Sequence, residues 1–147
     1  MFMNEKERRD ALQGLAMEAD AHQRRAQEIQ NQMQTLQMVE AEMEKTAEAL
    51  KSLKEKGNAL FTLGSGMFVS GEMKNTNKVL VNIGSNVLME MGVDDALKFI
   101  SERKSEVADA RDELIQGMQA VSARLGDIDT EARKIVGQAG GEGAGGA

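Results

Sequence analysis

The 147-residue chain contains no proline, no cysteine, no tryptophan and no tyrosine, and it has a single histidine. The absence of proline permits very long helices, because an interior proline costs a helix about 3 kcal/mol. The absence of cysteine excludes disulfide bonds and thiolate zinc sites, and it fits a reducing cytosol. Since His22 stands alone in a helical stripe, one subunit cannot assemble a histidine-based metal site or a nucleophile dyad. We therefore expect neither an enzyme nor a bound cofactor.

Charge and hydropathy exclude further classes of protein. The formal net charge is −6, and both signs are interleaved along the chain, so no basic patch indicates nucleic-acid binding. The first ten residues become charged too early for a signal peptide, and no apolar run approaches the roughly 18 residues of a membrane span. The composition predicts a cytoplasmic protein that binds neither nucleic acid nor membrane.

Two segments of equal length, residues 12–54 and 93–135, carry mostly apolar residues at an alternating spacing of three and four. The first stripe is apolar at ten of its thirteen positions, which are Leu12, Leu15, Ala19, His22, Ala26, Ile29, Met33, Leu36, Glu40, Met43, Ala47, Leu50 and Lys54. The second is apolar at eleven of thirteen, which are Val93, Leu97, Ile100, Lys104, Val107, Arg111, Leu114, Met118, Val121, Leu125, Ile128, Ala132 and Ile135. Six heptads in each segment predict a coiled coil of two long helices, residues 5–56 and 93–136.

Residues 60–91, between the stripes, contain only four charged side chains. Their apolar residues alternate with a period of two, and glycine, serine and asparagine separate the runs, which predicts two β-hairpins within residues 59–91. Because isolated hairpins are marginal in water, we expect the strands to join those of other subunits and to close into an intersubunit barrel. The residues expected at this oligomerisation surface are Phe68, Val69, Val79, Val81, Ile83, Val87 and Met89.

If the two helices pair antiparallel, paired positions should sum to a constant. A sum of 147 matches both ends of the stripes, and it pairs Leu50 with Leu97, Ile29 with Met118 and Leu12 with Ile135. The same register brings Glu40 near Lys104 and Arg111. We expect this cluster to fix the register at some cost in stability, unless the long side chains simply extend into solvent.

The last eleven residues, 137–147, contain six glycines and no large apolar group. Such a segment cannot repay the entropy of ordering, so we expect a disordered tail after a single domain of residues 1–136.

Three motifs carry a resemblance to a known family. They are Leu63 to Val69 (LGSGMFV), Asn77 to Asn86 (NKVLVNIGSN) and Gly92 to Ile100 (GVDDALKFI). A glycine-flanked hairpin turn, a second hairpin closed by glycine and an acidic helix start together resemble the alpha-type prefoldin subunit of archaea, since beta-type subunits have one hairpin. The resemblance covers the chain apart from its tail.

The resemblance implies an ATP-independent chaperone, or holdase, built as a hexamer of two alpha-type and four beta-type prefoldin subunits with coiled-coil tentacles. It implies that the tentacle tips bind unfolded polypeptides and deliver them to a group II chaperonin. The residues expected to contact clients are Met1, Phe2, Met3, Leu12, Leu15, Ile135 and Val136. The alternative from the residues themselves is a structural or adaptor coiled coil that docks one fixed protein partner.

Overall fold

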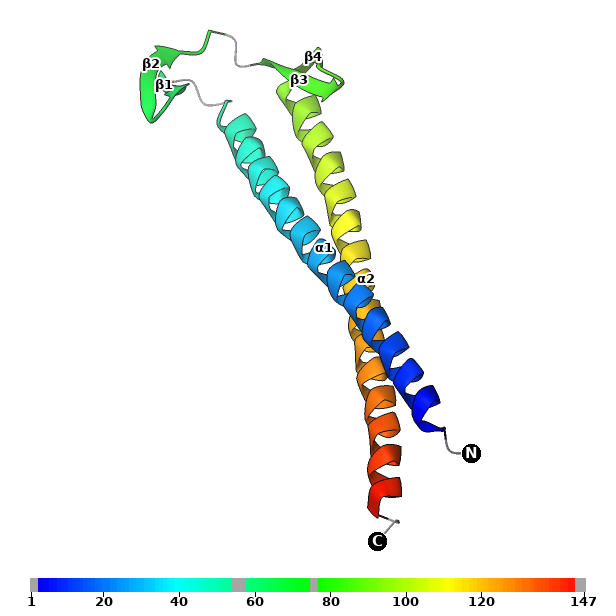
Figure 1. The fold of residues 1–147 in the computed structure, drawn as a ribbon. Coiled ribbons are helices and arrows are strands. Elements are labelled where there is room, and N and C mark those ends of the chain that lie inside the picture. Colours follow the sequence, from blue (N-terminus) through cyan, green and yellow to red (C-terminus); the bar gives the residue numbers. More distant parts are fainter. Residues whose placement is uncertain (1–2, 54–57, 75–76, 145–147) are drawn as a thin grey trace. The chain divides into compact units, whose positions relative to one another are not determined.

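The computed structural model describes residues 3–53, 58–74 and 77–144, with side chains up to residue 138. Two long helices stand at the two ends of the sequence, and four strands lie between them in chain order (Figure 1). The elements are α1 (Glu5–Ser52), β1 (Asn58–Gly64), β2 (Met67–Glu72), β3 (Lys78–Gly84), β4 (Val87–Gly92) and α2 (Val93–Ala144). This order confirms the predicted mainly helical fold with two inserted β-hairpins.

A capping box starts α1. The Asn4 side-chain oxygen accepts a hydrogen bond from the backbone N–H of Glu7 (2.8 Å), and the Glu7 carboxylate accepts one from the backbone N–H of Asn4 (3.1 Å). The two reciprocal bonds satisfy donors that a helix leaves without intrahelical partners at its N-terminus. The Arg8 guanidinium also donates to the Met3 carbonyl (3.2 Å). The first turn of α1 is therefore anchored by its own side chains.

The C-terminal ends of both helices differ from their predicted boundaries. α1 ends at Ser52 and is followed by a turn at Leu53, while the predicted extension over residues 54–56 lies outside the described residues. The sequence predicts that α2 ends at Val136 before a disordered tail, but α2 continues to Ala144. No proline interrupts it, and each residue added to an existing helix gains a hydrogen bond without a new nucleation cost. The glycines of this segment therefore weaken the helix without ending it.

The four strands form two separate antiparallel pairs, β1 with β2 and β3 with β4. Both residues of each two-residue turn have positive φ, with 52° and 76° at Ser65 and Gly66 and 50° and 60° at Ser85 and Asn86. Positive φ at both positions is typical of a type I′ turn, whose twist matches that of the adjoining strands. The glycine-flanked segments are thus hairpin turns, as predicted.

The two hairpins repeat one local structure. The strand register shifts just before each turn, at Gly64 and again at Gly84. At each shift the glycine N–H donates to a side-chain oxygen two residues earlier, that of Thr62 (3.3 Å) in one hairpin and Asn82 (3.0 Å) in the other. Both glycines have positive φ, 98° and 127°, where any other residue would be strained. The sequence therefore encodes the same bulged turn twice.

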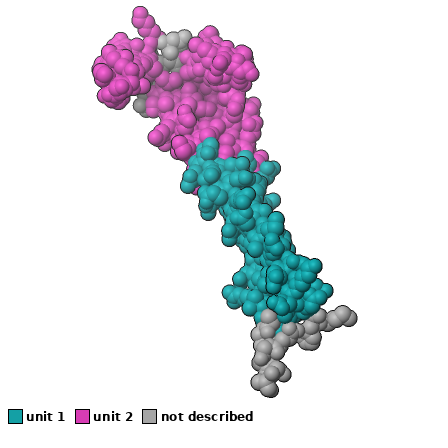
Figure 2. Space-filling view, viewed as in Figure 1, with its two compact units in different colours: residues 1–35, 110–147 teal, residues 36–109 magenta. Residues whose placement is uncertain are grey.

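The chain divides into two compact units (Figure 2). Unit 1 comprises residues 1–35 and 110–147, so it contains the beginning of α1 and the end of α2. Unit 2 comprises residues 36–109, with the remaining helical segments and all four strands.

The core of unit 2 lies where the helix ends meet the second hairpin. Leu50, Val93 and Ala96 are buried there. The half-buried side chains that pack against them are Leu53, Val79, Val81, Met91, Leu97 and Ile100. Because alternate residues of a strand share one face, this contact covers one face of the β3–β4 hairpin. The cluster also contains both members of the predicted pair Leu50 and Leu97.

The seam of unit 1 is centred on Ile29, whose side chain is fully buried. Its Cδ1 atom lies 3.4 Å from the position that a Cβ on Gly117 would occupy, so α1 and α2 approach closely at this glycine. Gly117 directly precedes Met118, the predicted partner of Ile29. Six of the seven buried apolar residues in the described part of the chain belong to the two predicted stripes, and Ala96 is the exception. The stripes therefore form the seam.

Candidate functional site

The hairpins of unit 2 expose an unusual amount of apolar surface. Eleven large apolar side chains are between 40% and 71% exposed, namely Leu60, Phe61, Leu63, Met67, Phe68, Val69, Leu80, Ile83, Val87, Leu88 and Met89. Each sheet has only two strands, so every strand also presents an edge of unpaired backbone groups. Apolar side chains beside open strand edges form a surface suited to pairing with strands of another chain.

Five of the seven predicted oligomerisation residues are exposed on this surface: Phe68, Val69, Ile83, Val87 and Met89. Val79 and Val81 are half-buried against the core of their own unit, which leaves less of them for a partner.

Sequence reasoning missed six members of this surface: Leu60, Phe61, Leu63, Met67, Leu80 and Leu88. A period of two selects one face of a strand, so it left out Leu80 and Leu88 on the opposite face of the second hairpin. All six lie within residues 60–91, and the low charge of that segment was the sequence signal that could have identified them.

The predicted client-contact residues lie in unit 1. Met3 is 39% exposed and Val136 is 58% exposed, whereas Leu12, Leu15 and Ile135 are half-buried. Met1 and Phe2 lie outside the described residues, so their contribution stays a prediction. Of the predicted client-contact residues with described side chains, Met3 and Val136 are thus exposed, beside a partly covered seam.

A groove opens along this seam in unit 1, with a volume of about 350 Å³. We call it the seam groove, and it is lined by Leu12, Leu15, Ala16, Ala19, Gln23, Leu125, Ile128, Asp129 and Ala132. Three of these residues are alanines, which are too short to fill the space between two helices.

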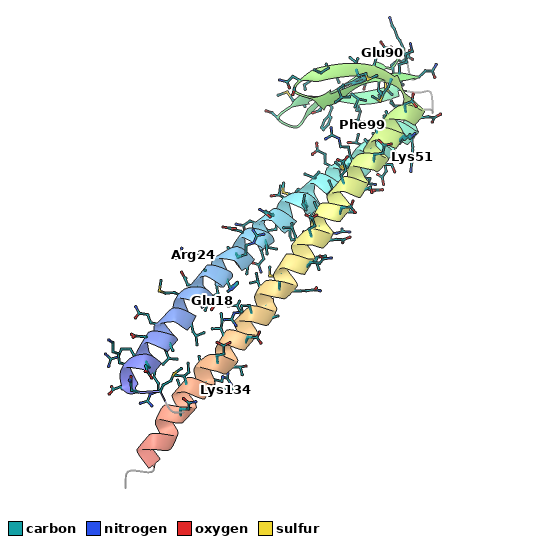
Figure 3. All side chains as sticks on the ribbon, turned by 90° about the vertical axis from the view of Figure 1, so that its right-hand side faces the viewer. Glu18, Arg24, Lys51, Glu90, Phe99 and Lys134 are labelled. Carbon is teal, nitrogen blue, oxygen red and sulfur yellow. The ribbon has the colours of Figure 1, made fainter. Side chains whose placement is uncertain are left out.

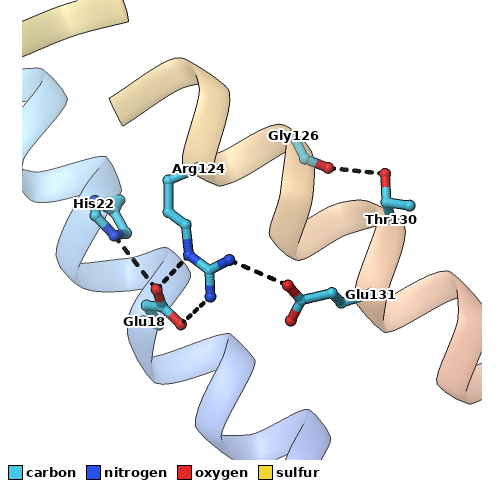
Figure 4. Close-up of polar contacts among 6 residues, drawn as sticks. All are labelled: Glu18, His22, Arg124, Gly126, Thr130 and Glu131. Carbon is cyan, nitrogen blue, oxygen red and sulfur yellow. Dashed lines mark hydrogen bonds and ion pairs between the residues drawn. The ribbon is translucent and has the colours of Figure 1, made fainter. Parts of the chain in front are cut away.

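An ionic cluster joins α1 to α2 in the same unit (Figure 4). The Arg124 guanidinium donates two hydrogen bonds to the Glu18 carboxylate, from Nε at 2.6 Å and from Nη2 at 2.9 Å, and a third to Glu131 at 3.1 Å. His22 Nε2 lies 3.6 Å from the same Glu18 carboxylate. We call this set the Glu18–Arg124 clamp. Bidentate pairs of this kind fix geometry as well as charge.

The clamp changes the acidity of its members. The hydrogen bonds from Arg124 hold the pKa of the Glu18 carboxyl below its ordinary value, and the nearby His22 acts in the same direction. The hydrogen bonds that Arg124 donates to Glu18 and Glu131 raise the pKa of its guanidinium, which stays charged. Glu18 and Arg124 are therefore both charged at neutral pH.

The predicted register cluster of Glu40, Lys104 and Arg111 has one observed component. Lys104 on α2 pairs with Glu44 on α1, one helical turn beyond Glu40. The hydrogen bond from Lys104 lowers the pKa of the Glu44 carboxyl. Arg111 belongs to unit 1 whereas Glu40 and Lys104 belong to unit 2, so the role of the complete cluster stays a prediction.

Other charged side chains lie on the solvent-facing sides of the helices. Arg24 on α1 is 77% exposed and pairs with Asp20 one turn earlier (2.6 Å), and Lys134 on α2 is exposed as well (Figure 3). Among the residues with described positions, no three His, Asp or Glu side chains converge in a way that could hold a metal ion. No helix in the described ranges is both long enough and apolar enough to cross a membrane.

Comparison with known proteins assigns the family. A sequence model described as "Prefoldin subunit" matches residues 22–138, which include both hairpins. The chain belongs to the prefoldin family. Prefoldin subunits form a chaperone family and not a known enzyme family, so the assignment fits a binding protein.

Several relatives of the chain are alpha prefoldin subunits of archaea. "Prefoldin subunit alpha" of Archaeoglobus fulgidus is 34% identical over 123 residues, which cover 82% of this chain and 85% of the relative. The protein of the same name from Methanobrevibacter smithii is 30% identical over 123 residues, covering 82% and 84% respectively. A chain in the cryo-EM structure of a filamentous prefoldin from Methanocaldococcus jannaschii superposes with a TM-score of 0.70 at 27% identity, covering 78% of this chain and 98% of that one. The resemblance to alpha-type archaeal prefoldin is confirmed.

Proposed function

We propose that the chain is the alpha-type subunit of an ATP-independent holdase that binds unfolded polypeptides and hands them to a group II chaperonin. Its partners are beta-type prefoldin subunits in a hexamer of two alpha and four beta chains, in the cytoplasm. The observation that carries the proposal is the set of eleven exposed apolar side chains on the two hairpins, because a chain of this composition needs other strands to cover them.

Assembly uses the hairpins of unit 2. Strands from beta-type subunits pair with the open edges of β1 to β4, and their side chains cover the exposed apolar faces. Closing the strands into a barrel leaves no edge free, which is the usual way in which such sheets avoid uncontrolled association.

Client binding uses unit 1. Met3 and Val136 provide exposed apolar groups, and methionine adapts its shape to different neighbours because its side chain is unbranched and polarizable. Each contact is weak, and several subunits that hold one client at once supply the affinity through effective concentration. Release then requires no chemical step.

Two measurements test the proposal. Co-expression with a beta-type subunit should give a mixed hexamer by native mass spectrometry, and that hexamer should suppress the aggregation of several unrelated unfolded proteins without ATP. The double variant Met3→Ser/Val136→Ser should keep the hexamer and suppress aggregation less well, while Met38→Ser, at an exposed methionine of α1 in unit 2, should act as the wild type does. Protection of one folded partner alone would instead support a coiled-coil adaptor.

A further inference from the structure

The two hairpins of unit 2 repeat one pairing pattern with a period of 20 residues. Asn58 faces Glu72 at the open end of the first hairpin, and Lys78 faces Gly92 at the open end of the second, 20 positions later. The other facing pairs of β1 and β2 recur in β3 and β4 with the same offset, including the shifted pair beside each turn. Residues 20 positions apart therefore occupy the same place and the same face of their hairpins.

Each hairpin exposes one methionine on its second strand. Met67 on β2 is 60% exposed, and Met89 on β4 is 52% exposed. The counterpart of Met67 is Val87 and the counterpart of Met89 is Val69, so each second strand carries one of these methionines and one of these valines two residues apart. Because residues two apart on a strand share a face, the repeat places one exposed thioether on the equivalent face of each hairpin.

On the second hairpin, this face adjoins the core of unit 2. Met89 faces Val81 on β3, and Val81 packs against the buried cluster of Leu50, Val93 and Ala96. Met89 therefore continues an apolar cluster beyond its covered part. A partner chain that extends the cover over Met89 removes its sulfur from water.

On the first hairpin, the equivalent face is open. Phe61 faces Val69 there, and the two side chains are 42% and 47% exposed on the same surface as Met67. The repeat thus presents two apolar faces of one design, and assembly that covers them buries both Met67 and Met89.

A thioether reacts with peroxides without a catalyst. The methionine sulfur attacks one oxygen of hydrogen peroxide, so an S–O bond forms while the O–O bond breaks, and the departing hydroxide takes the proton of the transferred OH group and leaves as water. The sulfur is oxidised by two electrons to the sulfoxide, and the peroxide is reduced by two. The sulfoxide is polar and accepts hydrogen bonds, so burying it among apolar side chains carries a desolvation cost that methionine does not have.

We propose that Met67 and Met89 are oxidation sites through which peroxides prevent the free subunit from assembling. This inference rests on the proposed assembly through the hairpins and adds its regulation. The free chain is sensitive because both thioethers are exposed, and the assembled chain is protected because its partners cover them. Reduction of the sulfoxides by the two methionine sulfoxide reductases, one for each epimer, restores the apolar surface.

The chain supplies a matched control. Met17 and Met38 on α1 are 69% and 74% exposed, so they react with peroxide as well, but their sulfoxides lie on helices outside the hairpin surface and stay hydrated. Two double variants separate the pairs, Met67→Leu/Met89→Leu and Met17→Leu/Met38→Leu, since leucine has nearly the volume of methionine and no sulfur. Circular dichroism checks that each variant folds.

Each full-length subunit is treated with hydrogen peroxide, quenched with free methionine and mapped by peptide mass spectrometry. It is then titrated with beta-type subunit, and native mass spectra give the concentration needed for half-maximal hexamer formation. Each variant is compared with its own untreated sample, so any effect of leucine on assembly itself cancels.

Oxidation should raise this concentration by about tenfold or more in the wild type and in Met17→Leu/Met38→Leu, and by less than about twofold in Met67→Leu/Met89→Leu. Treatment with both reductases should reverse the loss. In the assembled hexamer, the same peroxide should oxidise Met17 and Met38 and leave Met67 and Met89 reduced. Equal losses in the two double variants, or resistance of Met67 and Met89 to peroxide in the free chain, would overturn the proposal.

The untreated samples separate this proposal from the proposed function. If the untreated wild type forms the mixed hexamer and a chain oxidised at Met67 and Met89 forms it equally well, the oxidation proposal fails and the proposed assembly stands. If the untreated wild type forms no hexamer with the beta-type subunit, the proposed assembly fails and the oxidation proposal fails with it.

Discussion

Replacing Ile29 by alanine should be the most damaging single truncation in unit 1. Ile29 is the one large side chain in the described part of the chain that is fully buried, and its truncation removes three carbon atoms. At about 0.8 kcal/mol for each buried methylene, the loss of transfer free energy is about 2.4 kcal/mol. The facing residue is Gly117, which has no side chain to move into the hole, so a cavity term adds to this loss. We expect the free energy of unfolding to fall by about 3–4 kcal/mol.

Urea denaturation followed by circular dichroism measures this loss, with protein concentration held constant because association shifts apparent stability. Met17→Ala is the matched control, since Met17 is 69% exposed on the same helix and its truncation should change stability by less than about 0.5 kcal/mol.

A second substitution tests whether a cavity causes part of the stability loss in Ile29→Ala. A Cβ on residue 117 would point at the space that Ile29 vacates, so Gly117→Ala should stabilise the Ile29→Ala variant more than the wild type, by about 0.5–1 kcal/mol. Equal losses for Ile29→Ala and Met17→Ala would refute the view that Ile29 is the centre of the seam. Additive effects of the two seam substitutions would refute the cavity explanation.

Three further predictions concern the hairpin surface, two helical glycines and the Glu18–Arg124 clamp. Phe68→Ser should lower the yield of the mixed hexamer in native mass spectra, because Phe68 is 62% exposed on the hairpin surface, whereas Met38→Ser, at a 74% exposed helical site, should leave the yield unchanged. Gly14→Ala and Gly126→Ala should each raise the free energy of unfolding by about 1 kcal/mol in urea titrations, since an added Cβ meets nothing within 4 Å at either site; a loss of stability would refute the view that these are open helical positions. Because Arg124 holds the pKa of folded Glu18 below its ordinary value of 4.5, the unfolded chain takes up protons first as the pH falls, so the clamp's contribution is complete above about pH 4.5 and is lost below it. Glu18→Gln should therefore narrow the difference in stability between pH 7 and pH 3, and an unchanged difference would mean that the clamp does not support the fold.

The seam and the strands could be predicted from the sequence because each produces a periodic pattern of apolar residues. Burial recurs every three or four residues on a helix and every second residue on a strand, and Ile29, Leu50 and Val121 lie in the predicted stripes and are buried. The turns could also be predicted, because glycine, serine and asparagine separate the apolar runs, and Ser85 and Asn86 do adopt positive φ in a two-residue turn.

The Glu18–Arg124 clamp and the seam groove produce no periodic pattern in the sequence. Glu18 and Arg124 flank the stripes, and a stripe does not specify which flanking side chains reach across the seam. The groove exists because alanine side chains are short. Alanine is common in helices, so Ala16 indicates a groove only once the residues of α2 that face it are known. The capping box at Asn4 and Glu7 was within reach of the sequence, because asparagine followed three residues later by glutamate is a variant of a known start signal.

The hairpin surface links the fate of a newly made chain to the supply of its partners. Large apolar residues such as Leu60 and Phe68 have no cover within the chain, so the free subunit carries four open strand edges beside exposed side chains during the interval between synthesis and assembly. That state is prone to aggregation, and by mass action its lifetime shortens as the concentration of complementary strands rises. In the assembly that we propose, a cell that made this subunit in excess would accumulate an aggregation-prone polypeptide, so balanced synthesis of the subunits would limit its aggregation.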